Sequence, residues 1–280
     1  MNFREAEEYL FSLGNEVSAM KLGLESIRTL LTALGEPQNN YLKVQVAGTN
    51  GKGSVCAFLD SICRTADIKV GLYTSPHLVS ITERIRINGD DIGDSDFARL
   101  ATLVRDTSEQ LVAAGDLPSI STFFEQVTAI ALLAFAEAKV EIAILETGLG
   151  GRLDATTAAS AEICAITRID IDHQQYLGET IEEIAAEKAA IIHVGSRVVI
   201  GAQRPEAMKV LIDRCREVGL EPVIPGALTD TELGLKGKHQ LENAAIATGL
   251  ACHLAPLRPI SDDDILEGLV NARHRGRLEY

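Results

Sequence analysis

The chain has 280 residues, of which 46% are apolar and 4% aromatic, and it contains no Trp. This length allows one large domain or two small ones, and the core must be aliphatic. The formal net charge of −14 argues against a nucleic-acid partner, because a nucleic-acid binder needs a basic face to neutralise phosphates. An anionic substrate must therefore be captured by a local site, against the unfavourable field of the whole chain.

The cysteines and the start of the chain indicate a cytoplasmic, soluble protein. The five cysteines are odd in number, scattered and without a CxxC pair, so reduced thiols are expected rather than a disulfide framework or a zinc site. The first residues carry charge where a signal peptide needs apolar side chains, and no apolar run is long enough to span a bilayer. We therefore expect no membrane partner.

Short apolar runs alternate with amphipathic stretches along the chain. The runs predicted as strands are Tyr41–Val46, Lys69–Tyr73, Val140–Leu145, Glu162–Thr167 and Arg197–Ile200. The stretches predicted as helices are residues 52–66, 95–114, 122–138, 180–192, 205–218, 240–253 and 262–272. This alternation predicts the α/β class, with a mostly parallel sheet flanked by helices on both faces. Residues 74–94 and 221–238 contain turn signals and are expected to be irregular.

The first predicted strand ends in a cluster with the composition of a phosphate loop. Its members are Gly48, Thr49, Asn50, Gly51, Lys52, Gly53 and Ser54. Glycines allow a tight turn in which several N–H groups point at one anion, and the following helix adds its positive end. The pattern GxxxxGK[ST] is not met, because Val46 occupies its first Gly position and Gly53 follows the lysine. The combination of residues still favours a phosphate loop over the alternative, an ordinary strand-to-helix turn.

Three other predicted strands also end in polar or glycine-rich clusters. These clusters are Thr74-Ser75-Pro76-His77, the segment 146–154 with Glu146, Arg152 and Asp154, and the segment 168–173 with Asp172 and His173. Parallel neighbouring strands would bring all four clusters together beyond their carboxyl ends, where open parallel sheets bind ligands. Glu146 can ligate magnesium or cap a helix, and His173 can be a metal ligand or a hydrogen-bonded loop residue. The neighbouring Glu146 and phosphate loop favour the metal or phosphate role for His173, whereas both alternatives stay open for Glu146.

Lys188 occupies an unusual position in its predicted helix. It lies seven residues after Ile181 and four after Ile184, so it falls on the apolar stripe of that helix. One alternative is a snorkelling lysine that packs its stem on the core and keeps its amine in water. The other is an amine in a partly dry site with a depressed pKa. The pattern alone leaves both open.

Two further positions also have two interpretations. Glu125, beside Phe123 and Phe124, can help to bind a heteroaromatic ligand, or it can be a first-turn acid that favours the helix dipole. His239 and Asn243 open a helix of small residues, and the alternative to a ligand-binding role is a helix start in which Asn243 faces solvent.

Motifs in a fixed order give the chain a family resemblance. They are residues 48–54, Thr74-Ser75-Pro76-His77-Leu78, Glu83-Arg84-Ile85, Thr122-Phe123-Phe124-Glu125, residues 146–154, Asp172-His173, Glu187-Lys188-Ala189 and residues 239–245. This series resembles the folylpolyglutamate synthase and dihydrofolate synthase family, which belongs to the Mur-ligase-like group with its P-loop NTPase-like central domain. Departures from the family pattern are Thr157, Ala190 and the segment Arg273-His274-Arg275-Gly276 before the hinge.

The resemblance implies roles for single residues. Residues 48–54 would hold the ATP phosphates, with His239, Asn243 and Arg277 near the nucleotide. Two magnesium ions would involve Ser54, Ser75, Glu146 and His173, and Lys188 would be carbamylated beside them. Lys52, Glu146, His173 and Lys188 form the expected catalytic set. The substrate side is expected to comprise Ser75, Pro76, His77, Phe124, Glu125, Arg152 and Asp154.

The implied reaction joins L-glutamate to dihydropteroate or to the glutamyl chain of a reduced folate through an acyl phosphate formed with ATP. Residues 1–280 are expected to form one ATP-binding domain that ends at the hinge near residues 273–280, without the C-terminal glutamate-binding domain of the family. A monomer is expected. The alternatives are an ATP- or folate-binding module that cannot turn over alone and a Mur-like ligase with a different acid acceptor.

Overall fold

A seven-stranded sheet runs through the computed structural model, which describes residues 1–14, 23–229 and 231–275. Its strands are β1 (Leu42–Ala47), β2 (Val70–Tyr73), β3 (Ile85–Ile87), β4 (Asp90–Asp91), β5 (Ile142–Glu146), β6 (Ile163–Ile166) and β7 (Arg197–Ile200). The strand order is β4-β3-β2-β5-β1-β6-β7. Strands β2, β5, β1, β6 and β7 pair in parallel, whereas β3 and β4 pair antiparallel at one edge. The predicted mostly parallel sheet is confirmed.

The central strands are apolar on both sides because both faces of the sheet are buried. In β5, Ile142 and Ile144 join the core on one face, while Ala143 and Leu145 join the core on the other face. The same alternation divides β6, where Ile163 packs on one side and Cys164 on the other. A continuous apolar run without polar alternation is therefore what these positions require.

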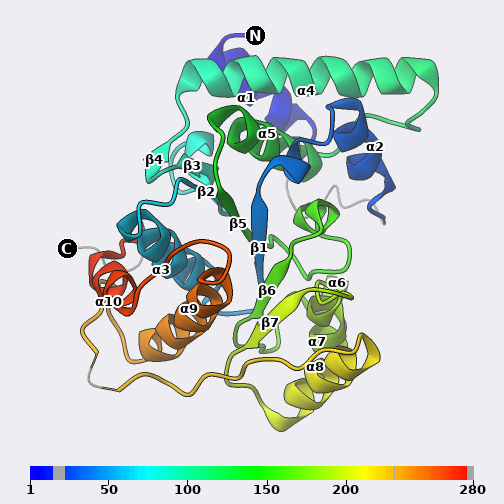
Figure 1. Cartoon of the computed structure of the whole chain (residues 1–280). Helices are drawn as coiled ribbons and strands as arrows, with labels where there is room; N and C mark the ends of the chain where they lie inside the picture. Colours follow the sequence, from blue (N-terminus) through cyan, green and yellow to red (C-terminus); the bar gives the residue numbers. More distant parts are fainter. Residues whose placement is uncertain (15–22, 230, 276–280) are drawn as a thin grey trace.

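Helices cover both faces (Figure 1). Helices α3 (Lys52–Thr65), α9 (Gln240–Leu254) and α10 (Asp262–Asn271) share one core with the sheet. The opposite face carries α1 (Phe3–Ser12), α2 (Glu25–Ala33), α4 (Asp94–Ala114) and α5 (Phe123–Ala138) over one half, and α7 (Ile181–Ala189) and α8 (Pro205–Glu217) over the other. The short helices are η1 (Pro37–Asn40), η2 (Ile81–Arg84), η3 (Ala155–Ala159) and α6 (Gln174–Leu177).

Three features differ from the sequence-based expectation. The N-terminal helices α1 and α2 were not predicted, although Asn2 and Glu5 form a reciprocal capping box that marks the start of α1. Residues 74–94 are not wholly irregular, because they include η2 and the β3–β4 hairpin. The helix expected over 180–192 ends at Ala189. In the segment 221–238, position 230 lies outside the described residues, and Val223 makes an isolated bridge to Val199.

Two further expectations concern the chain as a whole. The five cysteines carry free thiols, and four of them are buried, as their scatter predicted. No helix in the described ranges combines the length and the apolar character needed to cross a bilayer.

Helix α10 lies close to α3 because Gly268 leaves room for the backbone. A Cβ atom at Gly268 would lie 2.5 Å from Cα and 2.8 Å from the backbone N of Ile62. Backbone atoms cannot rotate away from such a contact. The packing of α10, which leads into residues 272–275, therefore depends on this glycine.

Replacing Gly268 with Ala should destabilise the fold by up to about 2 kcal/mol, which is the overpacking cost less the gain in helix propensity. Helix propensity favours Ala by about 1 kcal/mol, but overpacking against a rigid neighbour costs roughly 1–3 kcal/mol, and here the neighbour is backbone. Urea unfolding followed by circular dichroism measures the change. Gly226→Ala is the control, because Gly226 has no atoms within 4 Å of the added Cβ. A Gly268→Ala protein more stable than the parent would contradict this packing.

Candidate active site at the carboxyl ends of the parallel strands

The sheet has its topological switch at β1. The chain leaves β1 for β2 and β5 on one side and later adds β6 and β7 on the other. In open parallel sheets, ligands bind at such a point, beyond the carboxyl ends of the strands. The segments that follow β1, β5 and β6 are therefore expected to meet there, and their contacts agree. The N–H groups of Thr49 and Asn50 donate to the carbonyl of Arg168, at 2.9 Å and 3.1 Å.

The predicted phosphate loop has the backbone geometry of an anion site. Gly51 takes a left-handed conformation with φ 93° and is the N-cap of α3, which begins at Lys52 without a side-chain cap. The N–H groups of the first turn therefore have no partner within the helix. Together with the helix dipole they favour a negative ligand. Thr49 and Asn50 instead use their N–H groups to anchor the loop.

Two lysine amines meet at one carbonyl oxygen of this loop. Lys52 Nζ donates to the carbonyl of Gly48 at 3.2 Å, and Lys188 Nζ donates to the same oxygen at 2.9 Å. Lys188 comes from α7 and is only 4% exposed. Burial, and then the charge of Lys52, lower the pKa of Lys188 to about 7. The dry-site interpretation of Lys188 is thus confirmed, and the snorkelling alternative is wrong.

Gly48 must be glycine for a steric and a conformational reason. A Cβ atom there would overlap the hydroxyl of Thr167, and the φ of Gly48 is 152°. Thr167 directly follows β6 and is fully buried. Its position brings β6 against the loop that follows β1.

Glu146 ends β5 beside the first turn of α3. Its side chain is buried, and Oε2 accepts a hydrogen bond from the N–H of Ser75 at 3.3 Å. The other oxygen, Oε1, lies 3.5 Å from the position a Cβ of Gly53 would take. The clusters after β1, β2 and β5 are therefore brought together, as predicted.

Ser54 and the start of α9 meet on the phosphate loop. The Ser54 hydroxyl accepts a hydrogen bond from Gln240 Nε2 at 3.2 Å, and Asn243 donates to Gln240 Oε1 at 2.9 Å. The Asn243 amide also lies against Gly51, where a Cβ would overlap it. Asn243 is buried, so the alternative of a solvent-facing Asn243 is wrong. Gln240 belongs to the motif at residues 239–245 but was given no site role, and the structure shows that it links Asn243 to Ser54.

His173 and His239 are less closely tied to the loop. His173 has φ 46° and precedes α6, and its Nε2 lies 3.6 Å from Asp172 Oδ2. Among the described residues, no three His, Cys, Asp or Glu side chains gather to hold a metal ion. His239 is exposed, and its ring lies against Gly237. The metal role of His173 and the nucleotide role of His239 stay predictions. Arg277 lies outside the described residues.

The glycine-rich turn after β5 is held by Asp154. Its buried carboxylate accepts hydrogen bonds from the N–H groups of Gly148 at 2.8 Å, Leu149 at 3.0 Å and Thr156 at 3.0 Å. Burial raises the pKa of Asp154, and these hydrogen bonds oppose the rise. Arg152 forms an ion pair with Glu187 at 2.9 Å, next to Lys188. Asp154 and Arg152 thus hold neighbouring segments of the site in place. That either residue contacts substrate stays a prediction.

An aromatic wall flanks the site near the Ser75–Pro76 peptide, which is cis. Phe124 lies against Gly148, and its ring centroid is 6.0 Å from that of Tyr73. His77 Nδ1 accepts a hydrogen bond from Arg84 at 2.7 Å. Glu125 completes a capping box with Thr122, so the helix-start interpretation of this acid is confirmed.

The wall includes side chains that the motifs did not indicate. The rings of Phe11 and Phe123 stack with centroids 5.7 Å apart, and the guanidinium of Arg84 lies 5.3 Å from the Phe123 centroid. Phe11 belongs to the unpredicted helix α1, which explains why the sequence did not identify it.

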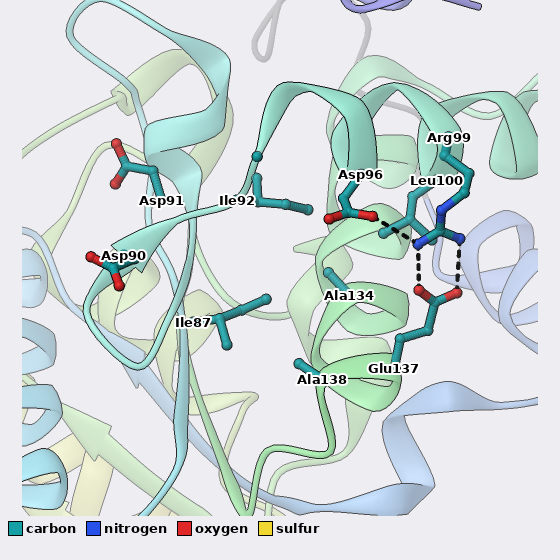
Figure 2. A pocket seen from close by; sticks show the side chains of 11 residues that line it. Ile87, Asp90, Asp91, Ile92, Asp96, Arg99, Leu100, Ala134, Glu137 and Ala138 are labelled. Atoms are coloured by element: carbon teal, nitrogen blue, oxygen red, sulfur yellow. Dashed lines mark hydrogen bonds and ion pairs between the residues drawn. The ribbon is translucent and has the colours of Figure 1, made fainter.

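A separate hollow of about 330 Å³ lies between the β3–β4 hairpin and helices α4 and α5 (Figure 2). Figure 2 shows Arg99 of α4 joined to both Asp96 and Glu137, which neutralise its charge. The floor is apolar, with Ile87 and Leu100 among its residues. This hollow does not include the phosphate loop.

Comparison with known proteins places this geometry in a family. Residues 46–218 match the Mur ligase middle domain. The structure superposes on folylpolyglutamate synthase from L. casei with a TM-score of 0.92 at 31% identity, covering 100% of this chain and 74% of that one. For the enzyme from Thermotoga maritima the TM-score is 0.86 at 35% identity, covering 99% of this chain and 67% of that one.

Curated relatives agree with the structural likeness. Dihydrofolate synthase/folylpolyglutamate synthase from Bacillus subtilis is 37% identical over 93% of this chain and 66% of its own length. A probable bifunctional folylpolyglutamate synthase/dihydropteroate synthase from Halobacterium salinarum is 36% identical over 100% of this chain and 36% of its own length. The chain thus spans between about a third and two thirds of the length of these relatives. It belongs to the folylpolyglutamate synthase and dihydrofolate synthase family of Mur-type ligases.

Gly48→Ala should weaken nucleotide binding at least tenfold, because the added Cβ meets Thr167 at the centre of the loop. Titration calorimetry with Mg-AMPPCP measures the change. Gly115→Ala is the control. It places Ala at φ 83° in open space at the C-terminal end of α4, so it adds backbone strain without touching the loop. Equal affinity of Gly48→Ala and the parent would show that this loop does not hold the phosphates.

The lowered pKa of Lys188 should appear in the pH dependence of stability. Between pH 7 and 10.5 the unfolded chain binds a proton at Lys188 that the folded chain has released. The free energy of unfolding therefore rises with pH in this window, by at most about 1.4 kcal/mol per pH unit. Below pH 7 both states are protonated at this residue, and its contribution is constant.

Lys188→Met should remove this slope, and urea unfolding at several pH values in CO2-free buffer measures it. Lys209→Met is the control, because Lys209 is exposed on α8. Parallel pH profiles for the parent and Lys188→Met would contradict a buried amine with a lowered pKa.

Proposed function

We propose that this chain carries the nucleotide site of an ATP- and Mg-dependent ligase that joins L-glutamate to dihydropteroate or to the glutamyl chain of a reduced folate. The observation that carries the proposal is the start of α3, which has no side-chain cap and follows the left-handed Gly51, with the amine of Lys52 on the carbonyl of Gly48 beside it. The N–H groups of a first helical turn and a lysine charge together attract a polyphosphate.

The named relatives support the choice of substrates. Solved structures similar to this chain include a folylpolyglutamate synthase complex with AMPPCP and one with AMPPCP and folate, each with a TM-score of 0.92. Of the aromatic wall, Phe11 is exposed and Phe124 is partly exposed, and such side chains suit a flat heteroaromatic ring that stacks on them. Acceptance of folate by this chain rests on these two observations together.

Magnesium fits the residues beside the loop. Mg²⁺ usually binds one or two carboxylates together with substrate phosphates and keeps several waters. The Glu146 carboxylate and the Ser54 hydroxyl lie at the first turn of α3, where they can supply such a partial set of ligands. When bound, magnesium would neutralise the charge of the phosphates. Ser75 and His173 are the further expected contributors.

Lys188 is suited to carbamylation. An amine with a pKa of about 7 is half neutral at neutral pH, and the neutral form is the nucleophile. Its nitrogen would bond to the carbon of CO2 and release one proton, which leaves a carbamate with one negative charge. Carbamylation would replace the Lys188 cation, which Lys52 repels, with an anion that Lys52 attracts.

The reaction then needs positioning and charge neutralisation. A carboxylate oxygen of the folate-type substrate attacks the γ-phosphorus of ATP, which forms an acyl phosphate and releases ADP. The glutamate amine attacks the acyl carbon, phosphate leaves, and the amine loses a proton. Lys52 and the N–H groups of the first turn of α3 would stabilise the charge that develops on the phosphate oxygens.

A nucleotide- and folate-binding module without turnover is the second candidate. The favouring observation is that the chain covers only 66% of the Bacillus subtilis relative and 64% of dihydrofolate synthetase from Saccharomyces cerevisiae. A glutamate site can lie in the part of the relatives that this chain does not match. A Mur-like ligase for another acid has no comparable support.

ADP release from the 280-residue chain with Mg-ATP decides between the candidates. Dihydropteroate or tetrahydrofolate is added, each with and without glutamate. Glutamate-dependent ADP release is the expected result and identifies the acceptor. Nucleotide binding without ADP release under every condition would favour the binding module. Absence of nucleotide binding would overturn both.

The carbamate is tested in the same assay with Lys188→Ala. A short-chain carboxylate that restores activity to this variant, but leaves Lys209→Ala unchanged, would support the proposed anion beside Lys52. Full activity of Lys188→Ala without any addition would contradict it.

A further inference from the structure

The segment Arg273–Arg275 follows α10 and returns to the phosphate loop. A Cβ atom on Gly53 would lie 2.5 Å from Nε2 and 3.2 Å from Cε1 of His274. The imidazole ring therefore lies directly on the backbone of Gly53, the second residue of α3. Glu146 Oε1 lies 3.5 Å from the same point. The His274 ring and the Glu146 carboxylate therefore both lie beside the first turn of α3.

A second contact fixes the same segment at the sheet edge. Arg275 Nη1 lies 2.6 Å from Asp91 Oδ2, and Asp91 belongs to β4. Figure 2 shows Asp91 on the hairpin, turned away from Arg99 and Glu137. Arg275 is 53% exposed, so its ion pair stabilises the segment only slightly. The segment is therefore attached at two points, by His274 on Gly53 and by Arg275 on Asp91.

The presence of Gly53 inside α3 supports a specific role for this contact. A glycine within a helix costs about 1 kcal/mol relative to Ala, and the common phosphate-loop pattern has Ser or Thr directly after the lysine. At this position any side chain would meet the His274 ring. The glycine thus provides the surface on which the imidazole packs.

We propose that His274 is a positioning residue for the nucleotide, which acts by packing on Gly53 and beside Glu146. The ring holds the first turn of α3 so that its N–H groups keep their direction toward the phosphates, and it limits the positions open to the Glu146 carboxylate. This proposal rests on the proposed nucleotide site. Because linkage is reciprocal, a bound nucleotide should in turn hold the segment 273–275 on the loop.

The test compares His274→Ala and His274→Phe with the parent. Titration calorimetry with AMPPCP, with and without magnesium, measures the dissociation constants. We expect His274→Ala to weaken binding about tenfold with magnesium and less without it, because Glu146 is the proposed magnesium ligand. His274→Phe keeps a ring on Gly53 and should bind within about threefold of the parent.

Arg273→Ala is the matched control, since Arg273 Nη1 donates only to the carbonyls of Val270 and Ala272 one to three residues before it. It should bind as the parent does. Parental affinity of His274→Ala, or an equal loss in Arg273→Ala, would overturn the positioning role. An equal loss with and without magnesium would overturn the part assigned to Glu146.

Hydrogen exchange of the free proteins separates this proposal from the proposed function. If even the parent fails to bind AMPPCP, the proposed function fails. The Val55 amide, whose hydrogen bond to the Gly51 carbonyl closes the first turn of α3, should still exchange several-fold faster in His274→Ala than in the parent and in His274→Phe. Unchanged exchange in this turn would overturn the proposal whatever the nucleotide result.

Discussion

The carbonyl oxygen of Gly48 accepts hydrogen bonds from two lysine amines, and the rest of the site is arranged around this contact. Lys188 reaches it from α7 on one face of the sheet, and Lys52 reaches it from the start of α3 on the other. Burial, and then the charge of Lys52, lower the pKa of Lys188 to about 7. The start of α3 beside the loop supplies N–H donors for an anion.

The topology explains why these groups converge. Strand β1 lies between β5 and β6, so the residues after all three strands share one edge of the sheet. Thr167 presses on Gly48, Glu146 faces Gly53, and Asn243 covers Gly51. Each of these glycines is held in place by a neighbour from another element. The loop is shaped by close packing with the elements around it more than by its own sequence.

Much of the site was predictable because strand-end clusters follow a physical rule. Continuous apolar runs predict parallel strands, and the rule that the carboxyl ends of such strands meet predicts that Gly48, Glu146 and Ser75 lie together. The environment of Lys188 was ambiguous, because hydrophobic periodicity shows which face of a helix a residue occupies but not how deeply its side chain is buried. The motif at residues 239–245 contains Gln240, but the contact of Gln240 with Ser54 was not predicted. Phe11 and His274 could not be found in this way, because they reach the site through long-range packing of α1 and of the segment after α10.

The loop after β1 is proposed to hold nucleotide phosphates against Lys52 and the first turn of α3, with Lys188 nearby. A crystal structure of this chain with Mg-AMPPCP tests it most directly. The account predicts phosphate oxygens within hydrogen-bonding distance of the N–H groups at the start of α3 and of Lys52 Nζ, with magnesium on the side of Glu146. A nucleotide bound elsewhere, with both lysine amines still on the Gly48 carbonyl, would contradict it.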